Sequence, residues 1–182
     1  MQLELDRVMF MPVGVAPHRE IELDPGAEAR LEMAGLAVGG DDRFEVSRME
    51  VEKESPAYTA ETLAALRDES PDDELFLILG GDQAAALGSW HEPERVLELA
   101  TVVVFERFSW GRNAIGIKIG RLPGARSVRY LDMPLIQVSS SAIRRRVREG
   151  RPIRYLVPDS VADYISSNDL YGAGLAEEAV TS

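Results

Sequence analysis

Cysteine is absent from the 182 residues of the chain. This absence excludes disulfide bonds, thiolate metal ligands and a cysteine nucleophile. Histidine is nearly as scarce, because only His18 and His91 occur, and each has at most one carboxylate beside it. Since a zinc site needs three or four ligands that converge, we expect no metal ligand from the protein itself.

Long apolar runs and an excess of basic residues are missing as well. No stretch approaches the roughly 20 apolar residues that cross a bilayer, and the first ten residues lack the layout of a signal peptide. Asp and Glu outnumber Lys and Arg by 31 to 20, which gives a net charge of −11. This balance argues against duplex nucleic acid or an anionic membrane as a partner. We expect a cytoplasmic protein, and a homo-oligomer stays open.

Short apolar segments that alternate with helical patterns are what the chain does contain. A continuously apolar strand is buried on both faces, and its alternation with helices is typical of an α/β fold with a parallel sheet, in which ligands bind beyond the carboxyl ends of the strands. We expect one domain over residues 1–182, with a frayed tail over 172–182. The predicted strands are 7–14, 43–53 with an irregularity near Ser47, 75–79, 101–107, 127–132 after a loop, and 133–138; the predicted helices are 25–38 with Asp24 as N-cap, 60–70, 93–100, 140–149 and 158–166.

Three serines followed by three arginines stand where the helix over 140–149 begins. Serine hydroxyls suit that end, whereas cations there cost roughly 0.3–1 kcal/mol each unless an anion offsets them. One interpretation is a capped helix whose basic face is solvated and whose Ile143 and Val147 face the core. The other is a phosphate cradle built from first-turn N–H groups, hydroxyls and an arginine. The placement of Arg144, Arg145 and Arg146 favours the cradle.

Two further segments follow predicted strands or helices and have two interpretations each. Gly80, Gly81 and Asp82 form either a flexible turn or a close approach to a nucleotide, although neither G-x-G-x-x-G nor G-x-x-x-x-G-K-[ST] occurs in the chain. Trp90 is either a packing residue or a platform for a flat ring, with neighbouring N–H groups available to a carboxylate. His91 stands beside it.

Taken together, four segments resemble the bacterial nicotinate-nucleotide adenylyltransferase family. They occur in the order and at the spacing of that family and cover nearly the whole chain. The resemblance implies a Rossmann-like, doubly wound parallel sheet of the nucleotidyltransferase (HIGH/HUP-type) superfamily. The segments are LDRVMFMPVGVAPHRE, SPAYTAETL, LFLILGGDQAAALGSWHEPERVLELATVVVFER and IQVSSSAIRRRVREGRPIRYLVPDSVADYI.

The resemblance also implies an activity and the residues for one substrate. The family transfers AMP from ATP to nicotinate mononucleotide and releases pyrophosphate and deamido-NAD, with Mg²⁺ bound to the ATP. The segment SSSAIR is similar to the family's ISSTxIR loop along the ATP phosphates, which implies Ser140, Ser141 and Arg144. The GGD turn is similar to the family's GAD turn near the adenosine, which implies Gly80 and Asp82.

The resemblance implies a different set of residues for nicotinate mononucleotide. Thr59, Trp90 and His91 resemble the nicotinate pocket of the family, with Trp90 stacked on the pyridine ring. His18 and Arg19 resemble its phosphate contact, where arginine replaces a frequent lysine. No nucleophilic side chain is needed, because the phosphate of nicotinate mononucleotide attacks the α-phosphorus directly.

One motif of the superfamily, GGxFxPxHxGH, does not occur in these 182 residues. In the family its two histidines contact the reacting phosphates, and its strand pairs with the strand expected over 7–13. We therefore expect that an upstream codon restores the motif. Two alternatives stay open: a remnant that binds nucleotides without turnover, and a sister enzyme that uses nicotinamide mononucleotide.

Overall fold

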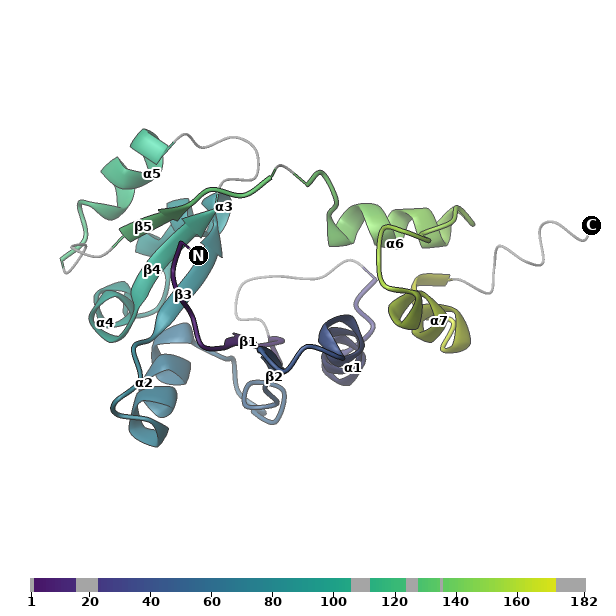
Figure 1. Cartoon of the computed structure of the whole chain (residues 1–182), viewed down its shortest axis with the longest axis horizontal. Coiled ribbons are helices and arrows are strands. Elements are labelled where there is room, and N and C mark those ends of the chain that lie inside the picture. The colour runs from purple at the N-terminus through teal and green to yellow at the C-terminus, as the bar shows by residue number, and fades with distance from the viewer. Residues whose placement is uncertain (1, 16–22, 106–111, 124–127, 135, 173–182) are drawn as a thin grey trace, which may run out of the picture. The chain divides into compact units, whose positions relative to one another are not determined.

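A computed structural model describes residues 2–15, 23–105, 112–123, 128–134 and 136–172 of the chain (Figure 1). The chain divides into two compact units. The two-stranded unit contains residues 3–57 and 138–182, and the three-stranded unit contains Gln2 and residues 58–137. The expectation that residues 1–182 form one nucleotidyltransferase domain stays a prediction.

The three-stranded unit has a parallel sheet with helices between its strands. Its strands are β3 (Phe76–Gly80), β4 (Thr101–Phe105) and β5 (Val128–Leu131), in the order β3-β4-β5. Its helices are α2 (Thr59–Glu69), α3 (Gly81–Ala86), the short 3₁₀ helix η1 (Leu87–Ser89), α4 (Pro93–Leu99) and α5 (Arg112–Ile119).

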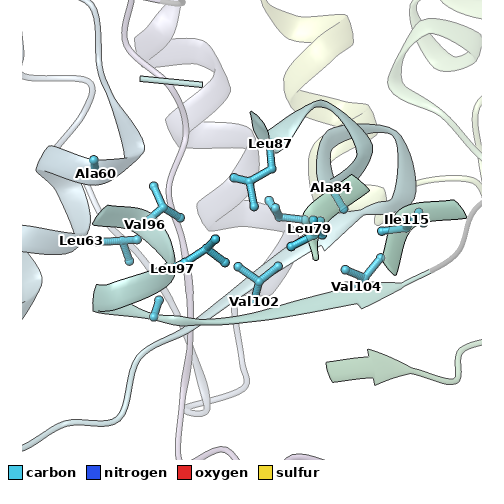
Figure 2. Close-up of a cluster of buried hydrophobic side chains, with 12 residues drawn as sticks. Ala60, Leu63, Leu79, Ala84, Leu87, Val96, Leu97, Val102, Val104 and Ile115 are labelled. Atoms are coloured by element: carbon cyan, nitrogen blue, oxygen red, sulfur yellow. The ribbon is translucent and has the colours of Figure 1, made fainter. Parts of the chain in front are cut away.

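The strand register explains where the core of this unit forms. Leu79 pairs with Val104, and Val104 pairs with Tyr130, so these three side chains share one face of the sheet. Residues from the helices pack against that face as one buried cluster (Figure 2). The helical members of the cluster are Ala60, Leu63, Ala84, Leu87, Val96, Leu97, Ile115 and Ile119.

The strand β4 is buried on both of its faces. Val102, Val103 and Val104 alternate between the two faces, and all three are 0% exposed. This confirms the prediction that a continuously apolar segment marks an interior strand of a parallel sheet. Among the described residues, no helix has both the length and the apolar composition needed to span a bilayer.

The two-stranded unit begins with a strand–helix–strand arrangement. Its strands β1 (Val8–Phe10) and β2 (Phe44–Val46) are parallel neighbours, and α1 (Ala27–Val38) connects them. The C-terminal part of the unit contains α6 (Ser140–Arg148), α7 (Asp159–Ser167) and the 3₁₀ helix η3 (Leu170–Gly172).

A second, smaller apolar cluster holds this unit together. Ile143 and Val147 of α6 pack with Ile153 and with Val161 and Ile165 of α7. Met33 and Leu36 of α1 pack against the same cluster, and the Ser160 hydroxyl donates a hydrogen bond to the Leu36 carbonyl at 3.1 Å. These contacts join the N-terminal and C-terminal parts of the chain within one unit.

The structure corrects several local predictions. Residues 133, 134 and 136–138 form no strand; Met133 and Ile136 are 48% and 62% exposed, so burial does not stabilise a strand there. The helix α5 lies where a loop was expected, and Ile115 and Ile119, one turn apart, are its buried face. The N-cap of α1 is Gly26, whose N–H donates to the Asp24 carboxylate at 3.0 Å.

Two strands are shorter than predicted. The strand predicted over 43–53 is wrong beyond Val46, because β2 stops there and residues 47–53 contain a turn over 49–52 instead of a second half of the strand. The strand predicted over 7–14 contains the three residues of β1. Of the tail expected over 172–182, Gly172 belongs to η3 and the rest lies outside the described residues.

Candidate functional site

The carboxyl end of β3 leads directly into α3 through Gly80 and Gly81. A Cβ atom at Gly80 would lie 3.0 Å from Oδ1 of Asp82 and 3.7 Å from the ring of Phe105. A side chain at this position would displace the carboxylate of Asp82, so glycine keeps Asp82 where it lies. Asp82 is exposed in the first turn of α3, where the helix dipole favours a carboxylate. Both predicted adenosine residues thus lie at the sheet edge where α/β folds bind ligands.

An aromatic contact brings two other predicted segments together. The rings of Tyr58 and His91 have centroids 4.3 Å apart, with 37° between their planes. Tyr58 precedes Thr59, which is half-buried and begins α2. The structure therefore places the segments of Thr59 and His91 side by side, although they are distant in the sequence.

Trp90 lies at the end of η1 and is half-buried. Its side chain packs against the apolar cluster of the three-stranded unit, which is the packing role that the sequence left open. Its backbone N–H donates to the carbonyl of Leu87 at 3.0 Å. That N–H is therefore engaged, and a carboxylate bound here needs other donors.

The turn that carries His91 is strained at the next residue. Glu92 has φ 48°, a left-handed conformation that non-glycine residues seldom adopt. The Glu92 carboxylate accepts a hydrogen bond from Arg95 at 3.2 Å and lies 4.0 Å from Nε2 of His91. Backbone strain of this kind is often found at functional turns.

Sequence reasoning assigned no role to Tyr58 or Glu92. Tyr58 occupies the N-cap of α2, a position that Ser, Thr, Asp or Asn usually fill. An aromatic residue immediately before a helix start was therefore a usable signal. The strain at Glu92 has no comparable signal in the sequence, because it depends on how the turn closes against α4.

In the two-stranded unit, the serines begin α6 as predicted. Ser139 is the N-cap, and its Oγ accepts a hydrogen bond from the N–H of Ala142 at 3.2 Å. Ser140 and Ser141 are the first two helical residues and are exposed. Nη2 of Arg144 donates to Oγ of Ser141 at 3.2 Å, so the arginine extends toward the start of its own helix.

The placement of the arginines corrects the electrostatic argument from the sequence. Arg145 and Arg146 belong to the last turn of α6, where the helix dipole favours cations. Arg146 also donates to the carbonyl of Pro152 at 2.8 and 3.0 Å. The helix dipole therefore requires no anion at Arg145 and Arg146. The prediction that Arg144 binds phosphate depends on its contact with Ser141 at the start of the helix. The predicted burial of Ile143 and Val147 is confirmed.

One titrating group responds to Arg144. Burial raises the pKa of Tyr171, and the guanidinium of Arg144 opposes that rise. Smaller effects come from Asp24, which raises the pKa, and from Arg30, which lowers it. The phenol of Tyr171 therefore lies within electrostatic range of Arg144 and of the Arg30–Asp24 ion pair.

The predicted site residues divide between the two units. Among the described residues, no three His, Asp or Glu side chains are grouped so that they could hold a metal ion. Magnesium bound with ATP stays a prediction. Thr59, Gly80, Asp82, Trp90 and His91 belong to the three-stranded unit; Ser140, Ser141 and Arg144 belong to the two-stranded unit; His18 and Arg19 lie outside the described residues.

Comparison with known proteins gives consistent results. The Cytidylyltransferase-like family model matches residues 1–146. A probable nicotinate-nucleotide adenylyltransferase of Thermus thermophilus is 42% identical over 167 residues, covering 92% of this chain and 84% of the relative. The Thermomicrobium roseum protein of the same name is 40% identical over 177 residues, covering 93% of this chain and 79% of the relative.

The solved structures agree at the level of the fold. Nicotinic acid mononucleotide adenylyltransferase of Plasmodium falciparum, complexed with NaAD, superposes with a TM-score of 0.73 at 16% identity. The match covers 93% of this chain and 84% of the Plasmodium chain. With this fold and this similarity over nearly its whole length, the chain belongs to the bacterial nicotinate-nucleotide adenylyltransferases, within the cytidylyltransferase-like family.

Proposed function

We propose that the protein transfers AMP from ATP to nicotinate mononucleotide, giving deamido-NAD and pyrophosphate in NAD biosynthesis. The names of its relatives support this activity. The structural observation that supports the proposal is the Tyr58–His91 ring contact, which joins the start of α2, where Thr59 follows Tyr58, to the turn that carries His91. A cytoplasmic location stays a prediction.

The proposed ATP contacts are those that the family resemblance implies. Ser140, Ser141 and Arg144 would bind the triphosphate, because hydroxyls and a guanidinium are donors suited to phosphate oxygens. Gly80 would let the backbone approach the adenosine, and Asp82 would accept a hydrogen bond from a ribose hydroxyl. The position of Gly80 and Asp82 at the carboxyl end of β3 and the bond between Arg144 and Ser141 support these roles.

The proposed contacts to nicotinate mononucleotide are aromatic at one end and basic at the other. Trp90 would stack on the pyridine ring, and Thr59 and His91 would line the same pocket. His18 and Arg19 would bind the phosphate of this substrate. A guanidinium suits that task, because it forms paired hydrogen bonds with phosphate oxygens.

The chemistry requires positioning more than acid–base catalysis. The phosphate oxygen of nicotinate mononucleotide attacks the α-phosphorus of ATP, and the bond to the departing pyrophosphate breaks. Arg144 would stabilise charge that develops on the phosphates, and the residues that bind the two substrates would supply positioning. Magnesium held by the ATP phosphates would supply further charge neutralisation. The described acidic residues contain no cluster that would hold it alone.

A second function is favoured by one sequence observation. The 182 residues contain no H-x-G-H motif, and the alternative to transfer is a protein that binds both nucleotides without turning them over. A third possibility is preference for nicotinamide mononucleotide as the acceptor. These alternatives differ in measurable ways.

The test combines binding with turnover. Calorimetry measures the Kd values for ATP and nicotinate mononucleotide, and a coupled assay measures pyrophosphate release with magnesium present. Pyrophosphate with matching deamido-NAD supports the proposal. Binding without pyrophosphate supports the binding-only protein. Faster turnover of nicotinamide mononucleotide supports the sister enzyme, and neither binding nor turnover contradicts all three.

A further inference from the structure

Tyr58 stands at the N-cap of α2 without capping the helix. Its side chain makes no hydrogen bond to the first turn. Only its carbonyl takes part, accepting from the N–H groups of Glu61 at 3.0 Å and Thr62 at 3.1 Å. A short polar side chain at this position would stabilise the first turn, so α2 forgoes that stabilisation. A residue that departs from such a local preference is expected to serve another purpose.

The ring of Tyr58 contacts a residue from another part of the unit. Its centroid lies 4.3 Å from that of the His91 imidazole, with 37° between the planes. Tyr58 is half-buried, and the side chain of His91 is 49% exposed. Aromatic rings at this distance attract each other. The contact therefore joins the start of α2 to the turn between η1 and α4.

That turn is held against two backbone preferences. Glu92 has φ 48° and ψ 57°, a left-handed conformation, and it precedes Pro93, before which extended backbone is favoured. Such a conformation persists only where the surrounding contacts determine it. The ion pair of Glu92 with Arg95 at 3.2 Å is one of them and is local in the sequence. The contact of Tyr58 with His91 comes from a different helix.

The two helices next to the contact are joined independently of Tyr58. Ala60 and Leu63 of α2 belong to the same buried cluster as Val96 and Leu97 of α4 (Figure 2). This apolar packing fixes the helices relative to each other. Loss of the Tyr58 ring should therefore release the turn and leave the packing of the helices in place.

We propose that Tyr58 is a positioning residue for nicotinate mononucleotide. Its ring fixes His91, and with it the turn that begins at Trp90, next to Thr59. The inference rests on the proposed function, in which Thr59, Trp90 and His91 bind the nicotinate end of this substrate. A turn that is ordered before binding loses less conformational entropy when the substrate binds, so the contact raises affinity. Tyr58 acts through His91 and need not touch the substrate.

The binding experiment uses the full chain and two substitutions of Tyr58. Tyr58→Leu removes the aromatic ring, and Tyr58→Phe keeps it. By calorimetry, the Kd for nicotinate mononucleotide should rise about threefold to tenfold in Tyr58→Leu, which corresponds to the contribution of an aromatic pair. The Kd for ATP should change less than about twofold, because the ring contact involves no residue proposed to bind ATP. Tyr58→Phe should resemble the wild type. The matched control is Tyr164→Leu, the same change at a half-buried tyrosine of α7.

A second readout is independent of any substrate. The chain has two histidines, so its proton–carbon NMR spectrum contains two sets of imidazole signals, and His91→Gln shows which set belongs to His91. The tyrosine ring current acts on the imidazole at 4.3 Å. The His91 signals should therefore move toward those of unfolded histidine in Tyr58→Leu. They should stay close to the wild-type positions in Tyr58→Phe and Tyr164→Leu.

Each contrary result has a distinct meaning. His91 signals that do not move in Tyr58→Leu overturn the ring contact. Signals that move while the Kd for nicotinate mononucleotide stays the same overturn the link to the substrate. An equal loss in Tyr58→Phe, or an equal loss for ATP, also overturns the proposal, because the hydroxyl or general loss of structure would then be responsible.

Failure of the proposed function looks different. In that case the wild type itself does not bind nicotinate mononucleotide, and the link to this substrate fails with it. The NMR signals of His91 still decide whether Tyr58 fixes the turn.

Discussion

The two units use the same parallel strand–helix pattern but are stabilised differently. In the three-stranded unit, Val102, Val103 and Val104 of the middle strand are 0% exposed. In the two-stranded unit, Phe10 and Phe44 remain 42% and 37% exposed, although their rings are in edge contact at 6.0 Å. A two-stranded sheet buries too little apolar surface to be stable by itself.

Polar contacts take a larger part in the two-stranded unit. Arg30 joins three backbone or carboxylate oxygens, and Ser160 of α7 binds the carbonyl of Leu36 in α1. The difference indicates that substitutions in the apolar core of the three-stranded unit should reduce global stability. Substitutions in the two-stranded unit should have smaller and more local effects.

The largest expected effect is on stability, from Leu87→Ala in the three-stranded unit. Leu87 is 0% exposed within the main cluster, so the truncation should cost about 3 kcal/mol in the free energy of unfolding. Phe10→Ala, at an exposed position, should cost about 1 kcal/mol or less. Urea denaturation of both variants measures the difference, and equal losses would contradict the comparison between the units.

The next effect concerns the residues of the three-stranded unit that are proposed to bind nicotinate. Removing the aromatic surface in Trp90→Ala should raise the Kd for nicotinate mononucleotide about tenfold or more, since stacking of a ring on an aromatic side chain contributes about 1–3 kcal/mol. The Kd for ATP should change less than about twofold. Thermal melting controls for loss of packing, because Trp90 also contacts the core. Equal changes for both ligands would remove Trp90 from the pocket.

A similar test applies to α6 of the two-stranded unit. Arg144→Ala should raise the Kd for ATP about tenfold, because a charge-assisted contact with phosphate is lost. The matched control is Arg145→Ala, which removes an exposed cation from the last turn of the same helix. If both variants weaken ATP equally, general positive charge on α6 is responsible and the specific role of Arg144 is wrong.

The smallest effect is a pH dependence at the surface of the two-stranded unit. Hydrogen bonds from the side chain and the backbone of Arg43 lower the pKa of Asp41 from 3.8 to about 2. A depressed pKa in the folded state means that the stabilisation is complete above about pH 4 and is lost as the pH falls through 2. The melting temperature of Asp41→Asn should therefore lie slightly below that of the wild type at pH 6 and converge with it near pH 2. A difference in melting temperature that does not change with pH would show that the Asp41–Arg43 ion pair is not its cause.

Strong local patterns made part of the fold predictable from the sequence. The apolar run at 101–105 and the serine cap at 139 are such patterns, and β4 and α6 form where they predict. The segment 133–138 is apolar too, but its described residues, 133, 134 and 136–138, form no strand, and tertiary context decides such cases. The spacing of Ile115 and Ile119 was visible in the sequence, but the glycine and arginine content around it obscured the helix.

The candidate site was predictable in its residue types and less so in its geometry. Family resemblance pointed to Thr59 and His91, and the ring of Tyr58 is what brings their segments together. The contacts of Arg30 in the two-stranded unit carried no sequence signal, because only the folded chain places the carbonyls around it. A contact between a side chain and a backbone atom that is distant in the sequence leaves no local pattern in a single sequence.

A pairwise titration tests the central claim most directly. Calorimetry measures the Kd values for ATP and nicotinate mononucleotide on the wild type, Trp90→Ala and Arg144→Ala. The account predicts a crossed result, in which Trp90→Ala weakens nicotinate mononucleotide alone and Arg144→Ala weakens ATP alone. Binding of both ligands that is unchanged in both variants, or weakened to the same extent, would contradict the assignment of the two substrates to these residues.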